Sequence, residues 1–376
     1  MIETETVVGA GMKITCSKEE LAEKLGVVAR AVSTRTAVQV LLGVMLRAEG
    51  GRLHLAATDM ELSLRASLDA EVEDEGAVVV QGRLLVDLAK LLPAGQVTIE
   101  HRPDEGVVRI DCGPSSYRLH TYSVEDFPRL PEVDALDTFA VDREALLETV
   151  SQVSRSASRD ESRPVLTGIL VRFEAGKLVM AATDSYRLSV KETELSGAAP
   201  ELEAIIPARA LGELSRIAAG VDDVEMGVQD NQIVFRAGQT TLTTRRIDGQ
   251  FPNYRQLLPE TFEHEVTLAR SELLEVVRRT SVMAQRNSPL RLRFAEGELT
   301  VSAQTQDVGE ARESVPAAWT GEPLEIGFNA EFLREGLESV PSDEVTLKLI
   351  SPLRPGLITG ERDDFWYLIM PIRLAG

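Results

Sequence analysis

Hydrophobic and polar residues follow one another along the chain in an order that occurs three times. Each time an amphipathic helix comes first, several half-buried strands follow, and a second helix lies midway. A period of about 3.6 residues predicts the helices, and strict alternation of apolar and polar residues predicts the strands. The opening helices are expected within 18–35, 142–163 and 270–286, and the second helices within 81–93, 207–220 and 329–341.

Local signals support these elements. Ser17 and Glu20 form the pattern of a capping box at the start of the first helix. Apolar residues occupy every second position over 62–72, which predicts one half-buried strand along this run. Alternating apolar positions on both sides of 230–231 (Asp-Asn) predict a β-hairpin. Each repeat is therefore expected to be an α+β domain with two helices and antiparallel sheets.

The repeat is also visible as similar residues. The string at 51–59, Gly-Arg-Leu-His-Leu-Ala-Ala-Thr-Asp, returns at 176–184 as Gly-Lys-Leu-Val-Met-Ala-Ala-Thr-Asp. Phe127-Pro128 returns as Phe251-Pro252, and a weaker third copy begins at Glu296. Such repeats are too long for a solenoid and close to a typical domain. The sequence predicts three tandem domains over 12–131, 132–260 and 261–376, preceded by a poorly ordered extension at 1–11.

Charge at first argues against nucleic acid as a partner. The 376 residues include 40 Lys and Arg against 60 Asp and Glu, and the net charge is -20. A broad basic surface is therefore excluded. The acidic residues are concentrated in the predicted strands and loops, however, while arginines gather towards the ends of the opening helices. Either these cations complement the helix dipoles, or the helices face one polyanion inside an acidic shell.

No catalytic, cofactor or metal motif is found. Phosphate-binding loops and nucleophile elbows are absent, the four histidines are scattered, and Cys16 and Cys112 are too few for a disulfide framework or zinc cluster. Asp59 and Asp184 are candidates for acid-dependent hydrolysis, but each follows an apolar strand, where Asp commonly bonds the backbone of a turn. An enzyme is not expected. Without an apolar run of about 18 residues or a signal-peptide pattern, a cytoplasmic protein without membrane contact is predicted.

Four stretches resemble the bacterial β sliding clamps, the processivity subunits of DNA polymerase III. They are 182–188 (Ala-Thr-Asp-Ser-Tyr-Arg-Leu), 251–255 (Phe-Pro-Asn-Tyr-Arg), 326–329 (Ile-Gly-Phe-Asn) and 370–374 (Met-Pro-Ile-Arg-Leu). The resemblance extends from Met12 to Leu374. It implies that two chains close head-to-tail into a homodimeric ring of six domains around double-stranded DNA, with helices lining the hole. Because DNA is held by enclosure, an acidic outer surface is compatible with this function.

The resemblance also implies the partners. A clamp is non-catalytic, needs no cofactor, and tethers the DNA polymerase III catalytic subunit, translesion polymerases and repair proteins; a separate clamp loader places it on DNA. Partners enter a peptide pocket between the second and third domains, where aliphatic residues and Met suit a short apolar motif. The matching residues are Leu166, Thr183, Ser185, Tyr186, Arg187, Leu188, Pro252, Leu257, Leu368, Met370, Pro371, Ile372, Arg373 and Leu374.

Arg187 and Arg373 are expected to bond backbone carbonyls or a glutamine of the partner. From the residues alone, 370–374 is better explained as a last edge strand that fills the core, and the resemblance is what favours the pocket. Three features depart from the family pattern: Ser185-Tyr186 replaces a common Gly-His, Gln256 stands where a second arginine is frequent, and Ala375-Gly376 extends beyond the usual terminal Leu. They leave the finer peptide preference open.

Two further sets of residues follow from the resemblance. Arg35 matches a DNA-contacting position of the family, and Arg155, Arg159, Arg278 and Arg279 are added as lining residues because of their charge and helix placement. Tyr117, Leu119, Val282 and Met283 match dimer-interface positions in apolar character. The alternative is a scaffold of the same three domains that does not bind DNA.

Overall fold

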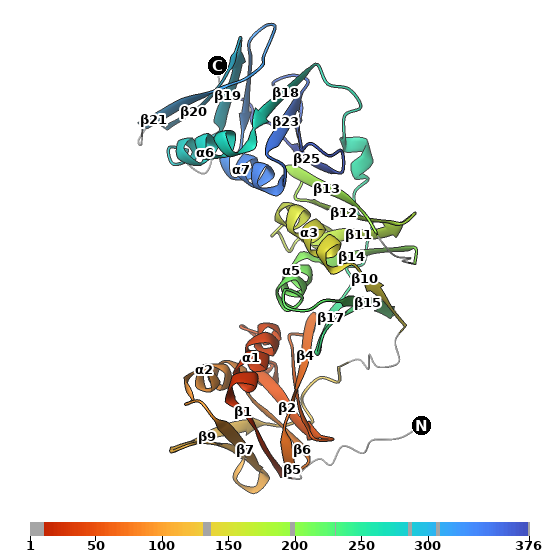
Figure 1. Ribbon diagram of the computed structural model, residues 1–376, viewed down its shortest axis with the longest axis vertical. Coiled ribbons are helices and arrows are strands. Elements are labelled where there is room, and N and C mark those ends of the chain that lie inside the picture. Colours follow the sequence, from red (N-terminus) through yellow and green to blue (C-terminus); the bar gives the residue numbers. More distant parts are fainter. Residues whose placement is uncertain are drawn as a thin grey trace. The chain divides into compact units, whose positions relative to one another are not determined.

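The computed structural model describes residues 11–130, 137–195, 200–229, 231–284, 288–305 and 309–374 (Figure 1). The predicted extension at 1–11, except its last residue, and Ala375-Gly376 lie outside the described residues. The chain divides into two compact units. Unit 1 contains the chain up to Arg143 together with 212–246, and unit 2 contains 144–211 together with the chain from Ile247 onward.

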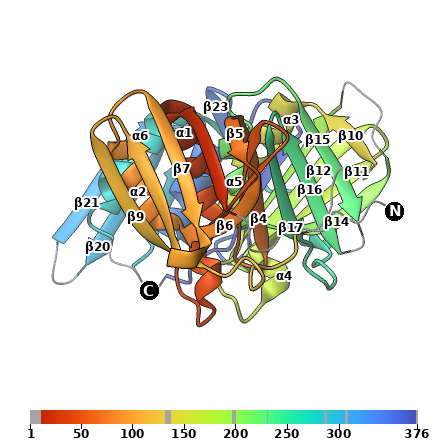
Figure 2. The same ribbon diagram turned by 90° about the horizontal axis from the view of Figure 1, so that it is seen from below.

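Unit 1 is built on a sheet of 13 antiparallel strands in the order β10-β15-β16-β17-β4-β3-β2-β6-β9-β8-β7-β1-β5. Figure 2 shows β15, β16 and β17 side by side. The strands are β1 (Met12–Ser17), β2 (Gly43–Glu49), β3 (Arg52–Thr58), β4 (Leu62–Asp69), β5 (Glu71–Asp74), β6 (Gly76–Gln81), β7 (Gln96–Arg102), β8 (Val107–Cys112), β9 (Ser115–Tyr122), β10 (Thr138–Val141), β15 (Val224–Gln229), β16 (Gln232–Ala237) and β17 (Thr240–Arg245).

Two helices of unit 1 contact each other beside this sheet, α1 (Lys18–Val28) and α2 (Gly82–Leu91) (Figure 1). The Oγ of Ser17 accepts a hydrogen bond from the backbone N–H of Glu20, so the predicted N-terminal cap is present. Leu21, Leu25 and Val28, three of the apolar residues on which this helix was predicted, are buried in α1 because they share one face of the helix. Short 3₁₀ turns lie at Ala29–Ala31, Gln39–Leu42 and Pro103–Glu105.

The single strand predicted over 62–72 is wrong. The run forms β4, which pairs with β3 and β17, and then β5, which pairs with β1. Between them, the backbone N–H of Ala70 bonds the carbonyl of Gly51, so the chain leaves the first ladder there. Alternation of apolar residues continues through this change of partner, which is why the pattern did not mark it. The predicted hairpin is confirmed, since Gln229 of β15 is paired with Gln232 of β16.

Unit 2 contains two antiparallel sheets. Their orders are β14-β11-β12-β13-β25-β24-β23-β18 and β21-β20-β19-β22. The strands are β11 (Gly168–Glu174), β12 (Lys177–Thr183), β13 (Arg187–Glu194), β14 (Leu202–Pro207), β18 (His264–Ala269), β19 (Leu290–Ala295), β20 (Glu298–Thr305), β21 (Gly309–Pro316), β22 (Leu324–Phe328), β23 (Glu344–Leu349), β24 (Gly356–Thr359) and β25 (Phe365–Ile369).

The helices of the second and third repeats lie where the sequence predicted them. Within unit 2, α6 contacts α7 (Figure 1). The α-helices are α3 (Arg143–Val153), α4 (Pro164–Thr167), α5 (Ala208–Ile217), α6 (Arg270–Ser281) and α7 (Ala330–Ser339), with 3₁₀ turns at Ser154–Ser156 and Tyr254–Leu257.

Three equivalent turns confirm the internal repeat. Gly51, Gly176 and Gly297 join the strand pairs β2–β3, β11–β12 and β19–β20, and their φ angles are 76°, 78° and 77°. This left-handed conformation favours glycine. The two units do not follow the three predicted domains, because the middle repeat pairs β17 with β4 of the first repeat and β13 with β25 of the third.

One close approach in unit 2 requires glycine. A Cβ on Gly336 of α7 would lie 2.5 Å from the ring of Tyr367, whose hydroxyl donates a hydrogen bond to the carbonyl of Phe332 over 2.7 Å. Tyr367 is fully buried. The ring therefore occupies the space that a larger residue of α7 would need.

Replacing Gly336 with Ala is expected to destabilise the protein by about 1–3 kcal/mol, because the extra methyl overpacks the Tyr367 ring. Gly212 of α5 is the matched control, since a Cβ there meets no atom within 4 Å. Gly212→Ala should stabilise by about 0.5–1 kcal/mol. Calorimetric melting of the two variants checks both signs. Equal stabilisation by both would contradict the proposed packing constraint.

Candidate functional site

The turn between β12 and β13, Thr183–Arg187, is called here the Asp184 turn. The Oδ1 of Asp184 accepts hydrogen bonds from the backbone N–H groups of Tyr186 (2.9 Å) and Arg187 (3.0 Å). Thr183 Oγ1 donates to the carbonyl of Arg187 over 2.6 Å. These bonds confirm that Asp184 is a turn residue, because its carboxylate serves the local backbone. They also turn Ser185 and Tyr186 outward, and Tyr186 is 62% exposed.

The C-terminal segment 370–374 begins beside this turn. The N–H of Met370 donates to the carbonyl of Tyr186 over 2.9 Å, and the N–H of Ile372 donates to the carbonyl of Gly327 over 2.8 Å. The segment is not a strand, since β25 ends at Ile369 and Ile372 makes a single bridge. The edge-strand alternative is therefore wrong. Met370 stays 43% exposed, Arg373 is exposed, and Pro371, Ile372 and Leu374 are half-buried.

A buried apolar layer lies beneath these exposed residues. Leu188 of β13 is paired with Leu368 of β25, and both belong to a core cluster with Phe251 and Tyr254. Next to this cluster in the chain, Pro252 and Leu257 remain exposed. The predicted residues thus separate into a buried floor and an exposed apolar rim.

The residue that precedes helix α4 is hydrogen-bonded to the Asp184 turn. Arg163 donates from Nη1 to the Oγ of Ser185 over 2.9 Å, and its carbonyl accepts from the N–H of Leu166 over 3.0 Å. Leu166 itself is buried. The structure therefore links α4, the Asp184 turn and the C-terminal segment by hydrogen bonds.

The partner contact expected from Arg187 is not supported by the geometry. Its side chain is only 8% exposed and forms ion pairs with Asp184 and with Glu335 of α7. It also bonds the carbonyl of Arg155 and lies over the Phe332 ring at 4.3 Å. Although burial opposes the charged form, Tyr367 and Glu335 together raise the pKa of Arg187. Its guanidinium is thus bound within the protein, and no local pattern indicated Glu335 as its partner.

Two of the predicted lining arginines share one carboxylate. Arg155 and Arg278 both pair with Glu338 of α7, the latter over 3.0 Å, and Arg334 lies 4.0 Å from the same group. Partial burial tends to raise the pKa of Glu338, but Arg278 and Arg155 lower it below its usual range. Arg279 pairs with Glu313, while Arg159 and Arg35 are exposed, Arg35 in unit 1. Sequence analysis missed Glu338, which lies far from these arginines in the chain.

The four predicted interface residues lie in two places. Tyr117 and Leu119 are on β9 of unit 1, where Tyr117 is exposed and Leu119 half-buried. Val282 and Met283 follow α6 in unit 2. Val282 is well exposed, whereas Met283 packs partly against the core of its own unit.

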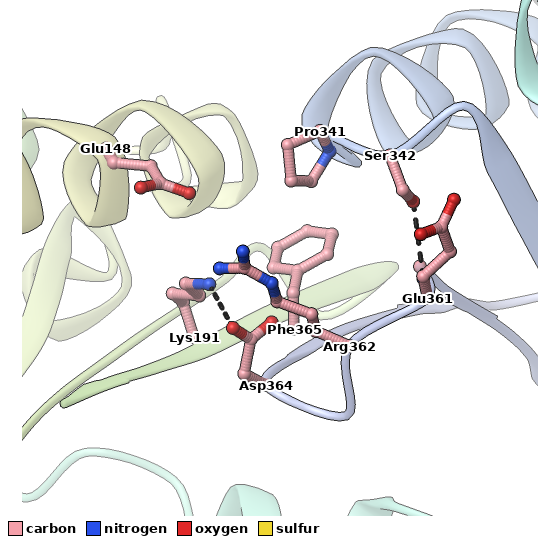
Figure 3. Close-up of a pocket in the computed structure, with 9 residues that line it drawn as sticks. Glu148, Lys191, Pro341, Ser342, Glu361, Arg362, Asp364 and Phe365 are labelled. Carbon is pink, nitrogen blue, oxygen red and sulfur yellow. Dashed lines mark hydrogen bonds and ion pairs between the residues drawn. The ribbon is translucent and has the colours of Figure 1, made fainter.

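A cavity of about 340 Å³ opens elsewhere in unit 2 (Figure 3). Lys191 of β13 is buried in its wall and pairs with Asp364 over 2.8 Å. Glu148, Pro341 and Arg362 also line it. None of the predicted site residues lines this cavity, and no motif signalled it because the lining comes from separate segments of the chain.

Other chemistry finds no support among the described residues. They contain no group of three His, Cys, Asp or Glu side chains able to hold a metal ion. Cys16 and Cys112 are both buried and free. No helix in the part of the chain that the structure describes is long and apolar enough to cross a membrane.

Comparison with known proteins identifies the family. Models of the DNA polymerase III beta subunit match in chain order: the N-terminal domain at 12–131, the central domain at 140–253 and the C-terminal domain at 255–373. The beta sliding clamp of Streptomyces coelicolor is 35% identical over 380 residues, covering 97% of this chain and 100% of the relative. That of Synechococcus elongatus is 36% identical over 382 residues, covering 96% and 100%.

Solved structures agree. The sliding clamp of Bacillus subtilis superposes with a TM-score of 0.92 at 26% identity, covering 97% of this chain and 100% of that one. A clamp from Pseudomonas aeruginosa bound to griselimycin gives 0.89 at 29% identity with the same coverage. The predicted resemblance and fold class, three tandem clamp domains of helices and antiparallel sheets, are confirmed. The chain belongs to the DNA polymerase III beta subunits, the bacterial sliding clamps, which are non-catalytic processivity factors of DNA replication.

Proposed function

We propose that this chain binds its partners through a surface made by the Asp184 turn and segment 370–374, which we call the partner surface. The hydrogen bond from Met370 to the carbonyl of Tyr186 carries this proposal, because it holds two exposed apolar residues together at the end of the β13–β25 pairing, two residues from the buried Leu188–Leu368 pair. The griselimycin complex of the Pseudomonas aeruginosa clamp supports a ligand site in a relative.

The composition of the partner surface suits short extended peptides with leucine and phenylalanine side chains. Tyr186 supplies a rigid aromatic face, and Met370 adapts its shape at low cost. Leu257, three residues after the buried Tyr254 in the chain, adds a third exposed apolar side chain. Arg373, which is exposed, is the basic side chain still available to a peptide carbonyl or glutamine, since Arg187 is occupied.

A labelled peptide of the Gln-x-Leu-x-Phe pattern is expected to bind saturably in fluorescence anisotropy. Tyr186→Ala and Met370→Ala should each weaken binding about 5- to 30-fold, the range of a truncated interface anchor. Deletion from Met370 onward should abolish it. Leu353→Ala is the control, because Leu353 is exposed in the same unit and outside the partner surface. Equal affinity of wild type and all these variants would place the peptide elsewhere.

We propose that two chains close head-to-tail into a ring. Residues 115–120 of β9 are paired with β8 alone, because β6 reaches only Thr121 and Tyr122. Strand β21 is likewise paired on one side, with β20. Long unpaired edges are templates for another strand, so these two edges suit a closed contact between the first and third domains.

Tyr117→Asp and Val282→Asp are each expected to shift the protein from dimer towards monomer in sedimentation velocity, since each places a charge in the proposed apolar contact. Leu353→Asp puts the same charge on an exposed apolar position outside it and should leave the dimer intact. A monomeric wild type at all concentrations would contradict the ring.

We propose that Arg35, Arg155, Arg159, Arg278 and Arg279 line the hole of this ring, around duplex DNA. Carboxylates within the chain already neutralise three of these arginines, Arg155, Arg278 and Arg279. Phosphates therefore have to displace Glu338 and Glu313, which keeps the grip on DNA weak and permits sliding. The proposed partners are the DNA polymerase III catalytic subunit, translesion polymerases, repair proteins and a clamp loader, in the cytoplasm where bacterial DNA lies.

Glu338→Gln is expected to tighten binding of a short labelled duplex and to steepen its salt dependence by about one unit for each arginine that gains a phosphate. Glu331→Gln, on the same helix, removes the same charge but has no arginine partner among the described residues. It should change neither quantity. Anisotropy over a salt series measures both. If neither wild type nor Glu338→Gln binds duplex at low salt, the DNA lining is refuted and the scaffold alternative gains.

A further inference from the structure

The Asp184 turn has a counterpart in unit 1, Thr58–Leu62, called here the Asp59 turn. Thr58 Oγ1 donates to the carbonyl of Leu62 over 3.1 Å, as Thr183 does to that of Arg187. Asp59 Oδ1 accepts from the N–H groups of Glu61 (3.1 Å) and Leu62 (2.8 Å). Asp59 and Asp184, which were considered as a pair of catalytic acids, thus occupy the same position in two copies of one turn.

The neighbouring strand is also repeated. The N–H of Arg245, at the end of β17, donates to the carbonyl of Glu61 over 3.1 Å, as Met370 does to Tyr186 over 2.9 Å. The register agrees, because Thr244 is paired with Leu62 where Ile369 is paired with Arg187.

A third backbone contact completes the correspondence. The N–H of Ser33 donates to the carbonyl of Leu41 over 3.0 Å, and the N–H of Ser158 donates to that of Leu166 over 2.8 Å. Unit 1 therefore contains, entirely within itself, the backbone frame on which the partner surface of unit 2 is built.

The side chains on the two frames differ in character. Met60 stands where unit 2 has Ser185, and Glu61 stands for Tyr186. Arg245 and Arg246 stand where unit 2 has Met370-Pro371. Both arginines are exposed, and neither forms an ion pair with any residue that the structure describes. The apolar rim of unit 2 is thus replaced by a rim with two guanidinium groups and the single carboxylate of Glu61, all exposed.

Apolar anchoring is kept in a different form. Met60 is 50% exposed and Val38, at the position of Arg163, is 54% exposed. Met60 also has a φ of 79°, in the left-handed region that costs free energy for a residue with a side chain. The turn therefore holds a long flexible apolar side chain out in water in an unfavourable backbone conformation, which is a feature associated with binding sites.

We propose that the Asp59 turn, Val38 and the pair Arg245-Arg246 form a second docking surface, which takes an extended peptide with an apolar anchor followed by acidic residues. Met60 and Val38 would contact the anchor, and the two guanidinium groups would bind carboxylates. Charge complementarity decides the occupant, because an exposed arginine pair without internal partners attracts carboxylates and discriminates against neutral or basic peptides. The inference rests on the proposed partner surface for its frame, and on its own side chains for its chemistry.

The test uses the full chain and two labelled peptides, Leu-Phe-Asp-Glu-Asp-Glu and its neutral twin Leu-Phe-Asn-Gln-Asn-Gln, in fluorescence anisotropy. The acidic peptide is expected to bind saturably, at least tenfold tighter than the neutral twin, and more weakly as salt rises. Arg245→Glu/Arg246→Glu should weaken it at least tenfold, and Met370→Ala should leave it unchanged. Binding of the Gln-x-Leu-x-Phe peptide should be weakened by Met370→Ala and left unchanged by Arg245→Glu/Arg246→Glu.

The variant Met60→Gly distinguishes a loss of peptide binding from a loss of protein stability. It removes the anchor and relieves the left-handed strain, so acidic-peptide affinity should fall while the melting temperature stays or rises. Ser185→Gly, at the equivalent φ of 81°, should not affect this peptide. The proposal is overturned if the acidic peptide binds no better than its twin, if Met370→Ala weakens it equally, or if the arginine variant alters only binding of duplex DNA. If the wild-type chain binds the acidic peptide but does not bind the Gln-x-Leu-x-Phe peptide, the partner surface is refuted and the second docking surface is not.

Discussion

Backbone pairing between strands of successive repeats is the interaction on which the rest of this structure depends. In unit 1, β17 of the middle repeat pairs with β4 of the first, and in unit 2, β13 pairs with β25 of the third. Each junction satisfies amides and carbonyls that an edge strand would otherwise present to solvent. The pairing also fixes the register, so Leu188 meets Leu368 and the N–H of Met370 reaches the carbonyl of Tyr186. The partner surface is thus a consequence of how the repeats are joined.

The distribution of charged residues is a second constraint on this structure. A protein with a net charge of -20 binds a polyanion only if its basic residues are concentrated and its acids lie elsewhere. Here several arginines of the helices are held by nearby carboxylates, as Glu338 holds Arg155 and Arg278. Exposed pairs of this kind add little stability, since water and salt screen them. In the proposed DNA lining their consequence is functional: each phosphate contact would cost the loss of an internal ion pair, so the net gain per contact would stay small.

Periodicity and repeats were sufficient to predict the elements, because helix and strand patterns are local. The helices, the cap at Ser17 and the hairpin of β15 and β16 were predicted in this way. The break between β4 and β5 was not, since alternation continues while the pairing partner changes. Partners distant in sequence were also missed. Nothing near Arg187 in the chain indicates Glu335, and nothing near Gly336 indicates the ring of Tyr367.

For the site residues, too, features that depend on neighbouring residues in the chain were predicted, and features that depend on distant residues were not. The recurrence of Thr-Asp was enough to identify both turns, since the side chains of Thr58, Asp59 and their counterparts each bond the backbone of their own turn. Which strand lies beside each turn depends on pairing across the chain, and no local pattern encodes it. The proposed partner surface was therefore located by resemblance, while the separation of its residues into buried and exposed groups required the structure.

The two frames also explain how one fold accommodates different surfaces. In each turn, Thr and Asp supply the side-chain bonds, whereas Glu61 and Tyr186, like Arg245 and Met370, contribute backbone groups to the contact with the neighbouring strand. A position that contributes only its backbone to the frame leaves its side chain free to change, because substitution there breaks no hydrogen bond of the turn. Such positions lie next to one another in space, since the contact between Glu61 and Arg245, or Tyr186 and Met370, joins them directly. Duplication of the frame therefore supplies two adjacent, variable and exposed positions at each junction, and in the two proposed surfaces the chemistry of the residues placed there sets what each junction would bind.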